Sequence, residues 1–120
     1  MTREPDASEV ALAPLTLERT GTAQNPVVVV HGEIDVATSP MLRSELAAVL
    51  AAQPADVTID LHDVSFVDSS GLGVMVGALK RLREAGGERF AILDPQDAVR
   101  KVFDITGLSS LFAIETSERA

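Results

Sequence analysis

Cysteine, tyrosine and tryptophan are all absent from this chain of 120 residues, and phenylalanine occurs only four times. Without cysteine the chain has no disulfide, no thiolate nucleophile and no cysteine-ligated zinc site. With so few aromatic residues, the hydrophobic core must be built mainly from Val, Leu, Ile and Ala, which supply most of the 46% of hydrophobic residues. The length fits a single domain with an ordinary core.

Basic residues are also scarce, because ten Lys and Arg stand against 18 Asp and Glu, for a formal net charge of −8. Affinity for nucleic acid depends mainly on Lys and Arg that neutralise phosphates, so we expect no direct binding to DNA or RNA. Lys80, Arg81 and Arg83 form one compact basic group, at the expected end of a helix, where the helix dipole favours cations. The net charge instead favours a basic protein partner.

Long hydrophobic runs are missing as well. No stretch approaches the roughly 18 to 20 apolar residues of a membrane span. The N-terminal MTREPDASEVALAP has acids and prolines where a signal peptide needs a basic start and an apolar stretch, so we expect a cytoplasmic protein. We expect a flexible arm at residues 1–13, one domain at residues 14–116 and a C-terminal tail at residues 117–120.

Five segments have the composition of strands. The four valines of residues 27–30 predict a strand buried on both faces, which Gly32 ends so that HGEID forms a turn. In residues 57–61 apolar and polar side chains alternate, which predicts a strand with one buried and one wetter face. The other strands are expected at residues 15–17, 89–93 and 112–115.

Three segments have helical spacing and recognisable ends. Ser39 is suited to be the N-cap of the first helix, and Pro40 to be its first residue. The second helix has an apolar stripe from Leu72 to Leu82 and ends at Gly86-Gly87, while the third is expected to run from an Asp94 cap to Thr106-Gly107. The order β-β-α-β-α-β-α-β predicts an α/β domain with a largely parallel sheet.

The stretch FVDSSGLG, residues 66–73, places an acid, two hydroxyls and two glycines just before the second helix. Asp68 or Ser69 is suited to cap that helix by accepting hydrogen bonds from backbone N–H groups. Capping does not explain Gly71 and Gly73, since each glycine costs up to about 1 kcal/mol in a helix interior. Their missing side chains let another surface approach the backbone, so the residues alone leave capping and docking both open.

A dinucleotide site is one alternative, because Gly71-Leu72-Gly73 resembles the start of the usual fingerprint and Asp94 could bind a ribose. Position 76, however, is Val76 where the third glycine is needed, and the glycines follow the expected strand end at Leu61 by ten residues. The spacing therefore argues against nucleotide binding.

Two further chemistries use the histidines. His31, Glu33 and Asp35 could act as metal ligands on one side of an extended segment, although residues of this kind more often lie in a solvated turn. HGE also copies half of the zinc-deaminase signature, but the cysteine pair that the signature requires is absent. A serine hydrolase would need Ser69 or Ser70 beside His31 or His62, and the chain has no G-x-S-x-G elbow.

The block SFVDSSGLGVMVGALKRLREAGG resembles the signature of the STAS-domain anti-sigma-factor antagonists, the bacterial anti-anti-sigma proteins. GEIDVATSP and VRKVFDITGLSSLF extend the resemblance, in the order and spacing of the family, over about residues 15 to 115. The resemblance implies a small mixed, mostly parallel sheet of four to five strands with helices mainly on one side. It also implies a non-enzymatic module without a cofactor, which binds an anti-sigma factor that is also a serine kinase.

In the family, this binding frees a sigma factor and phosphorylation of the module ends it. The resemblance places the phosphorylated serine at Ser69, with Ser70 as a secondary candidate, and gives Asp68 the task of positioning Ser69 or the kinase. It implies a serine phosphatase as a further partner. The residues expected to contact the partner are Glu33, Asp35, Asp68, Ser69, Ser70, Gly71, Leu72 and Gly73.

Other STAS domains are scaffolds, transporter tails or subunits of lipid-transport complexes, and a scaffold or transport-complex subunit without phosphorylation is the alternative here. Many members also carry a C-terminal helix after the last strand. This sequence reads ETSERA at that point, which leaves such a helix open.

Overall fold

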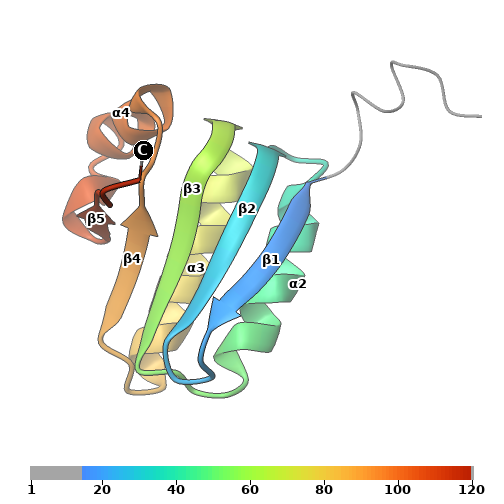
Figure 1. Ribbon diagram of the computed structural model, residues 1–120, viewed down its shortest axis with the longest axis vertical. Helices are drawn as coiled ribbons and strands as arrows, with labels where there is room; N and C mark the ends of the chain where they lie inside the picture. Colours follow the sequence, from blue (N-terminus) through green and yellow to red (C-terminus); the bar gives the residue numbers. More distant parts are fainter. Residues whose placement is uncertain (1–14, 120) are drawn as a thin grey trace, which may run out of the picture.

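The computed structural model describes residues 15–119, so the arm expected at residues 1–13 lies outside the described part of the chain. Five strands form one sheet in the order β1-β2-β3-β4-β5 (Figure 1). The first pair is antiparallel and the other three pairs are parallel, which confirms the predicted, mostly parallel sheet. The strands are β1 (Thr16–Gly21), β2 (Pro26–Ile34), β3 (Asp56–Val67), β4 (Arg89–Leu93) and β5 (Ala113–Glu115).

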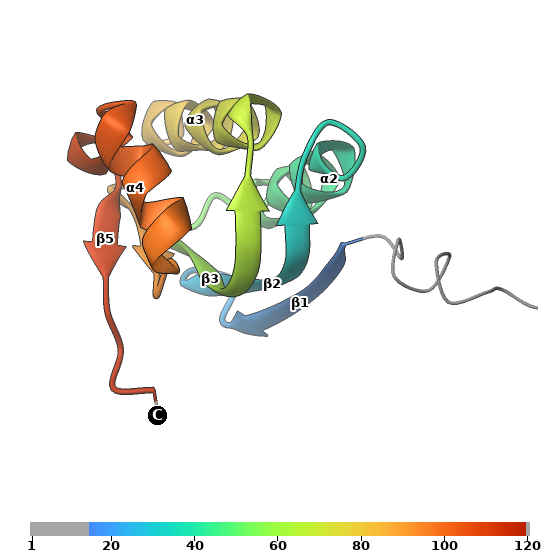
Figure 2. The same ribbon diagram turned by 90° about the horizontal axis from the view of Figure 1, so that it is seen from above.

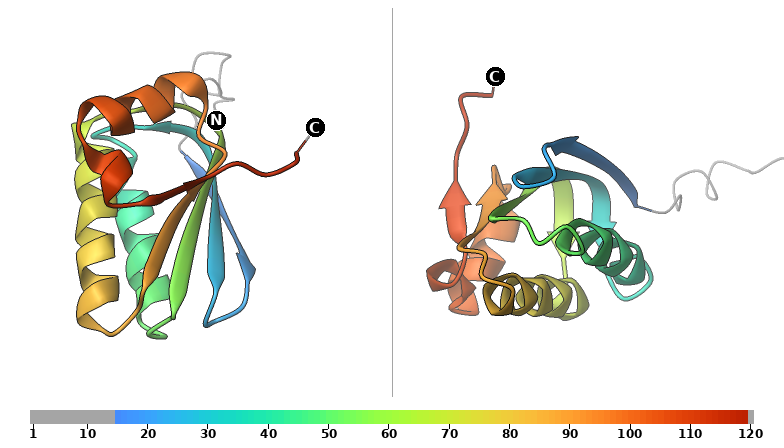
Figure 3. Two further views of the ribbon diagram at one scale, coloured as in Figure 1. Left: turned by 90° about the vertical axis from the view of Figure 1, so that its left-hand side faces the viewer. Right: turned by 90° about the horizontal axis from the view of Figure 1, so that it is seen from below.

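The helices gather on one side of this sheet, as predicted (Figures 2 and 3). Helices α2 (Ser39–Leu50) and α3 (Ser69–Glu84) run side by side, and α4 (Asp97–Ile105) contacts β3 near its carboxyl end. A 3-10 turn, η1 (Leu108–Ser110), leads from α4 into β5. In residues 15–119 the opposite face of the sheet carries no helix, so it is the wetter face.

The core lies between the sheet and the helices. The predicted stripe of α3 faces it, with Met75 and Leu82 fully buried, and α2 adds Leu42 and Leu46. Phe112 packs edge-to-face against two other rings, with centroid distances of 5.3 Å to Phe90 and 5.7 Å to Phe103. This small aromatic cluster fastens α4 and β5 to the end of the sheet.

Strand β2 departs from the prediction in two ways. Val28 and Val30 are fully buried while Val27 and Val29 are half-buried, because helices cover only one face, so the expected burial on both faces is wrong. Gly32 does not end the strand either: β2 continues to Ile34 through register shifts on both sides of Gly32. Gly32 has φ 119°, a conformation that suits glycine at such an irregularity.

Strand β3 runs to Val67, well beyond the end predicted at Leu61. Its polar second half keeps strand geometry because it pairs with β2, for example Asp63 with His31 and Phe66 with Glu33. One residue, Asp68, therefore separates β3 from α3. This tight strand-to-helix turn corrects the spacing argument used against a dinucleotide site, although Val76 still stands where the third glycine is required.

Two helix starts also differ from the prediction. Thr38, and not Ser39, is the N-cap position of α2, and its side chain makes no capping hydrogen bond. Helix α4 begins at Asp97, after Gln96 at the N-cap, whereas a cap at Asp94 was expected. Asp94 instead has φ 51° and accepts hydrogen bonds from Ser117, so contacts with a distant segment determine its place. The expected ends of α3 and α4 are confirmed by Gly86 (φ 91°) and Gly107 (φ 78°).

Candidate functional site

The DSSG segment lies where β2 and β3 end and α3 begins (Figure 1). The backbone N–H of Asp68 donates to the carbonyl oxygen of Ile34 at 3.0 Å, which ties the segment to β2. The Asp68 side chain accepts from the backbone N–H groups of Ser70 at 2.9 Å and Gly71 at 3.2 Å. Asp68 is therefore the N-cap of α3, one of the two caps that the sequence left open.

The two hydroxyls that follow Asp68 have different surroundings. Ser70 is half-buried, and its Oγ donates to Asp68 Oδ1 at 2.5 Å. Ser69 is the first residue of α3, is exposed, and its Oγ makes no hydrogen bond with any described residue. One serine thus completes the cap while its neighbour presents a hydroxyl to the surface.

Asp68 is also the most heavily bonded acid of the site. The Ser70 hydroxyl lowers its pKa most, and the N–H groups of Gly71, Ser70 and Val36 lower it further against an opposing effect of burial. The carboxylate is therefore ionised at neutral pH.

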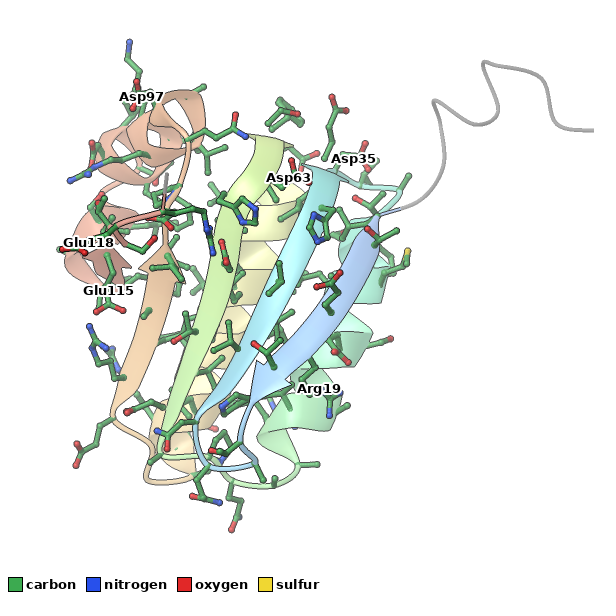
Figure 4. The ribbon with its side chains drawn as sticks, viewed as in Figure 1. Arg19, Asp35, Asp63, Asp97, Glu115 and Glu118 are labelled. Carbon is green, nitrogen blue, oxygen red and sulfur yellow. The ribbon has the colours of Figure 1, made fainter. Side chains whose placement is uncertain are left out.

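The GEIDVATSP loop is shaped by Asp35, which Figure 4 shows at the end of β2. The half-buried carboxylate of Asp35 accepts from the N–H groups of Ala37 at 2.9 Å and Thr38 at 3.0 Å. The Thr38 hydroxyl in turn donates to the carbonyl oxygen of Glu33 at 2.8 Å. The structure therefore brings GEID and DSSG together. The Glu33 side chain is exposed, whereas the Asp35 carboxylate bonds within its own turn.

The two glycines of the motif have opposite surroundings. Gly71 is buried, and a Cβ there would overlap Ile34 Cγ2 and lie 3.1 Å from Val67 Cγ1. Gly71 is thus required for the close packing of α3 on the sheet, and Leu72 beside it is buried in the core. A Cβ at Gly73 would meet nothing within 4 Å, so Gly73 belongs to the exposed surface.

Two exposed apolar residues flank this site and were missed from the sequence. Val36, with 76% of its surface exposed, follows Asp35, and Phe66, with 47% exposed, pairs with Glu33 across the sheet. Exposed apolar side chains that gather in one patch often mark protein contacts. In the sequence, the only indication of their role was that Val36 follows GEID and Phe66 lies two residues before DSSG.

Both histidines lie on the helix-free face of the sheet, with ring centroids 6.0 Å apart. His31 Nδ1 is 2.6 Å from Asp63 Oδ2, and the Asp63 hydrogen bond raises the pKa of His31. His62 Nδ1 is 2.9 Å from Asp60 Oδ1. Neither ring bonds to Ser69 or Ser70 in the described structure, so the pairing that a serine hydrolase needs is not formed.

The proposed metal ligands fare no better. Among residues 15–119, no group of three or more His, Asp or Glu side chains is placed to hold a metal ion. His31 instead pairs with Asp63, and Asp35 shapes its own turn. Nor does any helix in this range have the length and apolarity that crossing a bilayer requires.

A second acid, Asp60, is buried on the same helix-free face with only 3% of its side chain exposed. Arg119 reaches it from the segment after β5, with contacts of 3.1 and 2.6 Å. Burial would raise the pKa of Asp60, but the bonds from Arg119 and His62 outweigh burial and lower the pKa to about 2. Arg119 also lies 3.1 Å from Asp94. This cluster is a structural joint between the sheet and residues 116–119.

Comparison with known proteins places these features in a family. The family model of the STAS domain matches residues 15–120. The anti-sigma-B factor antagonist of Bacillus subtilis (strain 168) is 44% identical over 85 residues, which are 71% of this chain and 76% of that relative.

Solved structures agree. An anti-sigma factor antagonist from Mycobacterium paratuberculosis has a TM-score of 0.77 and 31% identity, with 87% of each chain covered. The anti-sigma factor antagonist SpoIIAA in its unphosphorylated form has a TM-score of 0.73 and 28% identity, covering 87% of this chain and 89% of SpoIIAA. The Bacillus SpoIIAA in its phosphorylated form has a TM-score of 0.66 and 27% identity, covering 87% of this chain and 92% of that one.

Proposed function

Because the chain belongs to the STAS-domain family of anti-sigma factor antagonists, we propose that it binds an anti-sigma factor through the surface around Ser69 and thereby frees a sigma factor. In this proposal the anti-sigma factor is also a serine kinase, and phosphorylation of Ser69 ends the binding. A serine phosphatase resets the hydroxyl, and the whole cycle takes place in the cytoplasm. The chain acts as a binding module that contributes no catalytic group.

The observation that carries this proposal is the contrast between Ser69 and Ser70. A kinase needs a hydroxyl that is accessible and free to act as the nucleophile toward the γ-phosphoryl group. Ser69 is exposed and its Oγ has no bond with a described residue, while the Ser70 hydroxyl is held by Asp68. The structure therefore favours Ser69 over the secondary candidate Ser70.

Phosphorylation at this place is compatible with the fold. Ser69 is the first residue of α3, and an anion at a helix N-terminus gains about 0.3–1 kcal/mol from the helix dipole. Asp68 holds the first N–H groups of the helix, so the phosphate does not need to displace them. The fold that the phosphorylated form of SpoIIAA shares with this chain supports the same conclusion.

The effect of the phosphate falls on the interface instead. A phosphoserine adds about −1.5 to −2 charge at pH 7, next to the ionised Asp68 and close to the strand that carries exposed Glu33. A partner shaped to a bare hydroxyl would meet this bulk and charge at a cost of about 2–5 kcal/mol. At about 1.4 kcal/mol per factor of ten, binding weakens roughly 30-fold to several thousand-fold.

Phosphopeptide mapping tests the assignment. We expect the chain incubated with its cognate anti-sigma factor and ATP to carry phosphate on Ser69, and Ser69→Ala to accept none. Ser70→Ala is the matched control, because it removes the neighbouring hydroxyl and should leave Ser69 a substrate. Label on Ser70 in the unaltered chain would contradict the assignment.

The same experiment distinguishes the proposed phosphorylation switch from the alternative role as a scaffold or transport-complex subunit. A scaffold or lipid-transport-complex subunit of this family would accept no phosphate at either serine and would co-purify with membrane-transport components. That result would replace the switch with a constitutive binding role.

A further inference from the structure

A shallow groove of about 200 Å³ is lined by residues of α2 and α3, the two helices that lie next to each other on one face of the sheet (Figure 2). Its floor is built from small and aliphatic residues, among them Ala47 of α2 and Ala78 of α3. Enclosed pockets for small molecules usually hold roughly 300–1,000 Å³. This groove is smaller and open, so it fits a row of side chains from another protein better than it fits a small ligand.

The groove exists because one row of α3 has two adjacent positions without a side chain, Gly73 and Gly77. Ser69, Gly73, Gly77 and Arg81 follow one another at intervals of four, and all four are exposed. Rows of this spacing normally form the ridges by which helices pack. A Cβ at Gly73 or Gly77 would meet nothing within 4 Å, so the internal packing of the chain does not require glycine at either position. The ridge is interrupted at Gly73 and Gly77, which both line the groove.

Both walls of the groove carry an arginine, Arg43 from α2 and Arg81 from α3. Both are exposed, and neither forms an ion pair with a described residue, although acids outnumber bases in the chain. Arg19, Arg89 and Arg119 each pair with an acid, whereas Arg83 and Arg100 are exposed and, like Arg43 and Arg81, form no ion pair with a described residue. Arg43 and Arg81 differ from these two in lining an apolar groove, and their charge complements an acidic occupant.

We propose that an amphipathic helix of the anti-sigma factor, with an apolar ridge and acidic side chains on its flanks, docks in the α2–α3 groove. This inference rests on the function proposed above and assigns the partner segment that the surface receives. The ridge enters the channel left by Gly73 and Gly77, and carboxylates of the partner pair with Arg43 and Arg81. The net charge of the chain favours a partner that is basic overall. In this proposal the segment of the partner that docks in the groove is an acidic one.

Ser69 precedes Gly73, the first α3 residue that lines the groove, in the same row of the helix. Ser69 and Gly73 lie one helical turn apart, about 6 Å along the axis. A phosphate on Ser69 is therefore within the screening length of roughly 8 Å of the Gly73 end of the groove, which the acidic docked helix occupies in this proposal. The like charges repel, so the same helix that makes the contact also senses the modification.

Site-specific crosslinking tests the occupant directly, because the chain has no cysteine and a single introduced one is unique. The probe is the anti-sigma factor that wild-type chain captures from its host lysate and Ser69→Glu does not, prepared as a pure protein. Gly77→Cys carrying a benzophenone is expected to crosslink to an acidic helical segment of it. Ala98→Cys, exposed on α4, is the matched control and should give no such product.

Affinity measurements with the same probe complete the test. We expect Gly77→Leu, Arg43→Glu and Arg81→Glu each to weaken binding at least about 10-fold, since a filled channel and like charges oppose docking. Arg100→Glu, exposed on α4, should leave the dissociation constant unchanged. Circular dichroism melts should show every variant folded, because these positions are exposed. Gly77→Leu should match or exceed the wild-type melting temperature, while Arg81→Glu should melt slightly lower, because it replaces a cation that the helix dipole favours.

The outcomes distinguish the two proposals. If Ser69→Glu weakens binding while the three groove variants do not, the groove inference is wrong and the Ser69 switch stands. A crosslink from Gly77→Cys to a second copy of this chain, to its own residues 1–14 or to a basic segment would also overturn the inference. If wild-type chain captures no anti-sigma factor, the proposed function fails and the inference falls with it.

Discussion

Asp60 and Asp68 lie on β3 and at its end, and in both the pKa of the carboxyl group is below its ordinary value. Asp68 achieves this locally, through N–H and O–H groups from the first turn of its own helix and from the adjoining loop. Asp60 depends on Arg119, which lies 59 residues further along the chain, and on His62. Asp68 thus organises the surface around Ser69, and Asp60 holds residues 116–119 against the sheet.

This difference teaches where the molecule has freedom to change. The Asp60 cluster is buried and connects parts of the chain that are far apart in sequence, so altering it should affect stability. The Asp68 cap is short-range and leaves Ser69 exposed beside it, so altering it should affect recognition more than stability. Each prediction below is aimed at one side of this contrast.

The largest effect on stability is expected at the long-range joint. Asp60→Asn removes a buried charge that receives two bonds from Arg119 and two from His62, and should lower the free energy of unfolding by about 3 kcal/mol. Arg119→Ala should act in the same direction, and the double variant should lose less than the sum of the two. Urea unfolding measures all three, and simple additivity would show that the pair is not coupled.

The same joint predicts an acid limit. A carboxylate with a depressed native pKa stabilises the fold above its ordinary pKa and loses that contribution as the pH falls through the native value. For Asp60 the window runs from about pH 4 to about pH 2, and the loss amounts to about 2 kcal/mol. Wild type should lose more stability across this window than Asp60→Asn, and parallel curves for the two would contradict the assignment.

Substitutions at the two glycines of the motif distinguish a residue that is required for core packing from one that lies on the surface. Gly71→Ala should lower the free energy of unfolding by about 2 kcal/mol, because the new methyl overlaps Ile34 in a filled core. Gly73→Ala should raise it by up to about 1 kcal/mol, since the site is open and alanine favours a helix. Thermal unfolding of the pair checks this, and a loss of stability in both would mean that Gly73 is also packed.

The smallest change in stability is expected at the cap. Asp68→Ala loses the acceptor for the Ser70 and Gly71 N–H groups, so its melting temperature should fall by less than that of Asp60→Asn. Asp68→Asn keeps an acceptor and should melt close to wild type. Phosphate incorporation by the kinase should nevertheless fall in Asp68→Ala, because the cap positions Ser69. Unchanged phosphate incorporation in Asp68→Ala would show that Asp68 does not position Ser69 for the kinase.

The sequence predicts those features whose causes are local. The apolar stripe of α3, its glycine stop and the cap before it are set by residues within a few positions of one another, and all three are present. The carboxyl half of β3 could not be predicted, because His62 and Asp63 disrupt the alternation and the strand depends on pairing with β2. Strand geometry there is a property of the sheet rather than of the segment.

The site divides in the same way. Asp68 and the two serines could be identified from DSSG, but the separate environments of the hydroxyls depend on side-chain geometry that spacing does not reveal. Long-range contacts gave no local signal, so the Asp60–Arg119 pair was missed and Asp94 was taken for a cap. The groove was missed from the sequence because the helix dipole already explained the position of Arg81.

The most direct test of the central claim compares the affinity of the anti-sigma factor for the unmodified chain and for the chain stoichiometrically phosphorylated on Ser69. Titration calorimetry gives both dissociation constants, and a thermal melt of each sample reports the fold. The account predicts binding weakened roughly 30-fold or more, from a cost of at least 2 kcal/mol, with nearly the same melting temperature. Equal affinities, or a phosphorylated chain that has lost its cooperative unfolding transition, would contradict it.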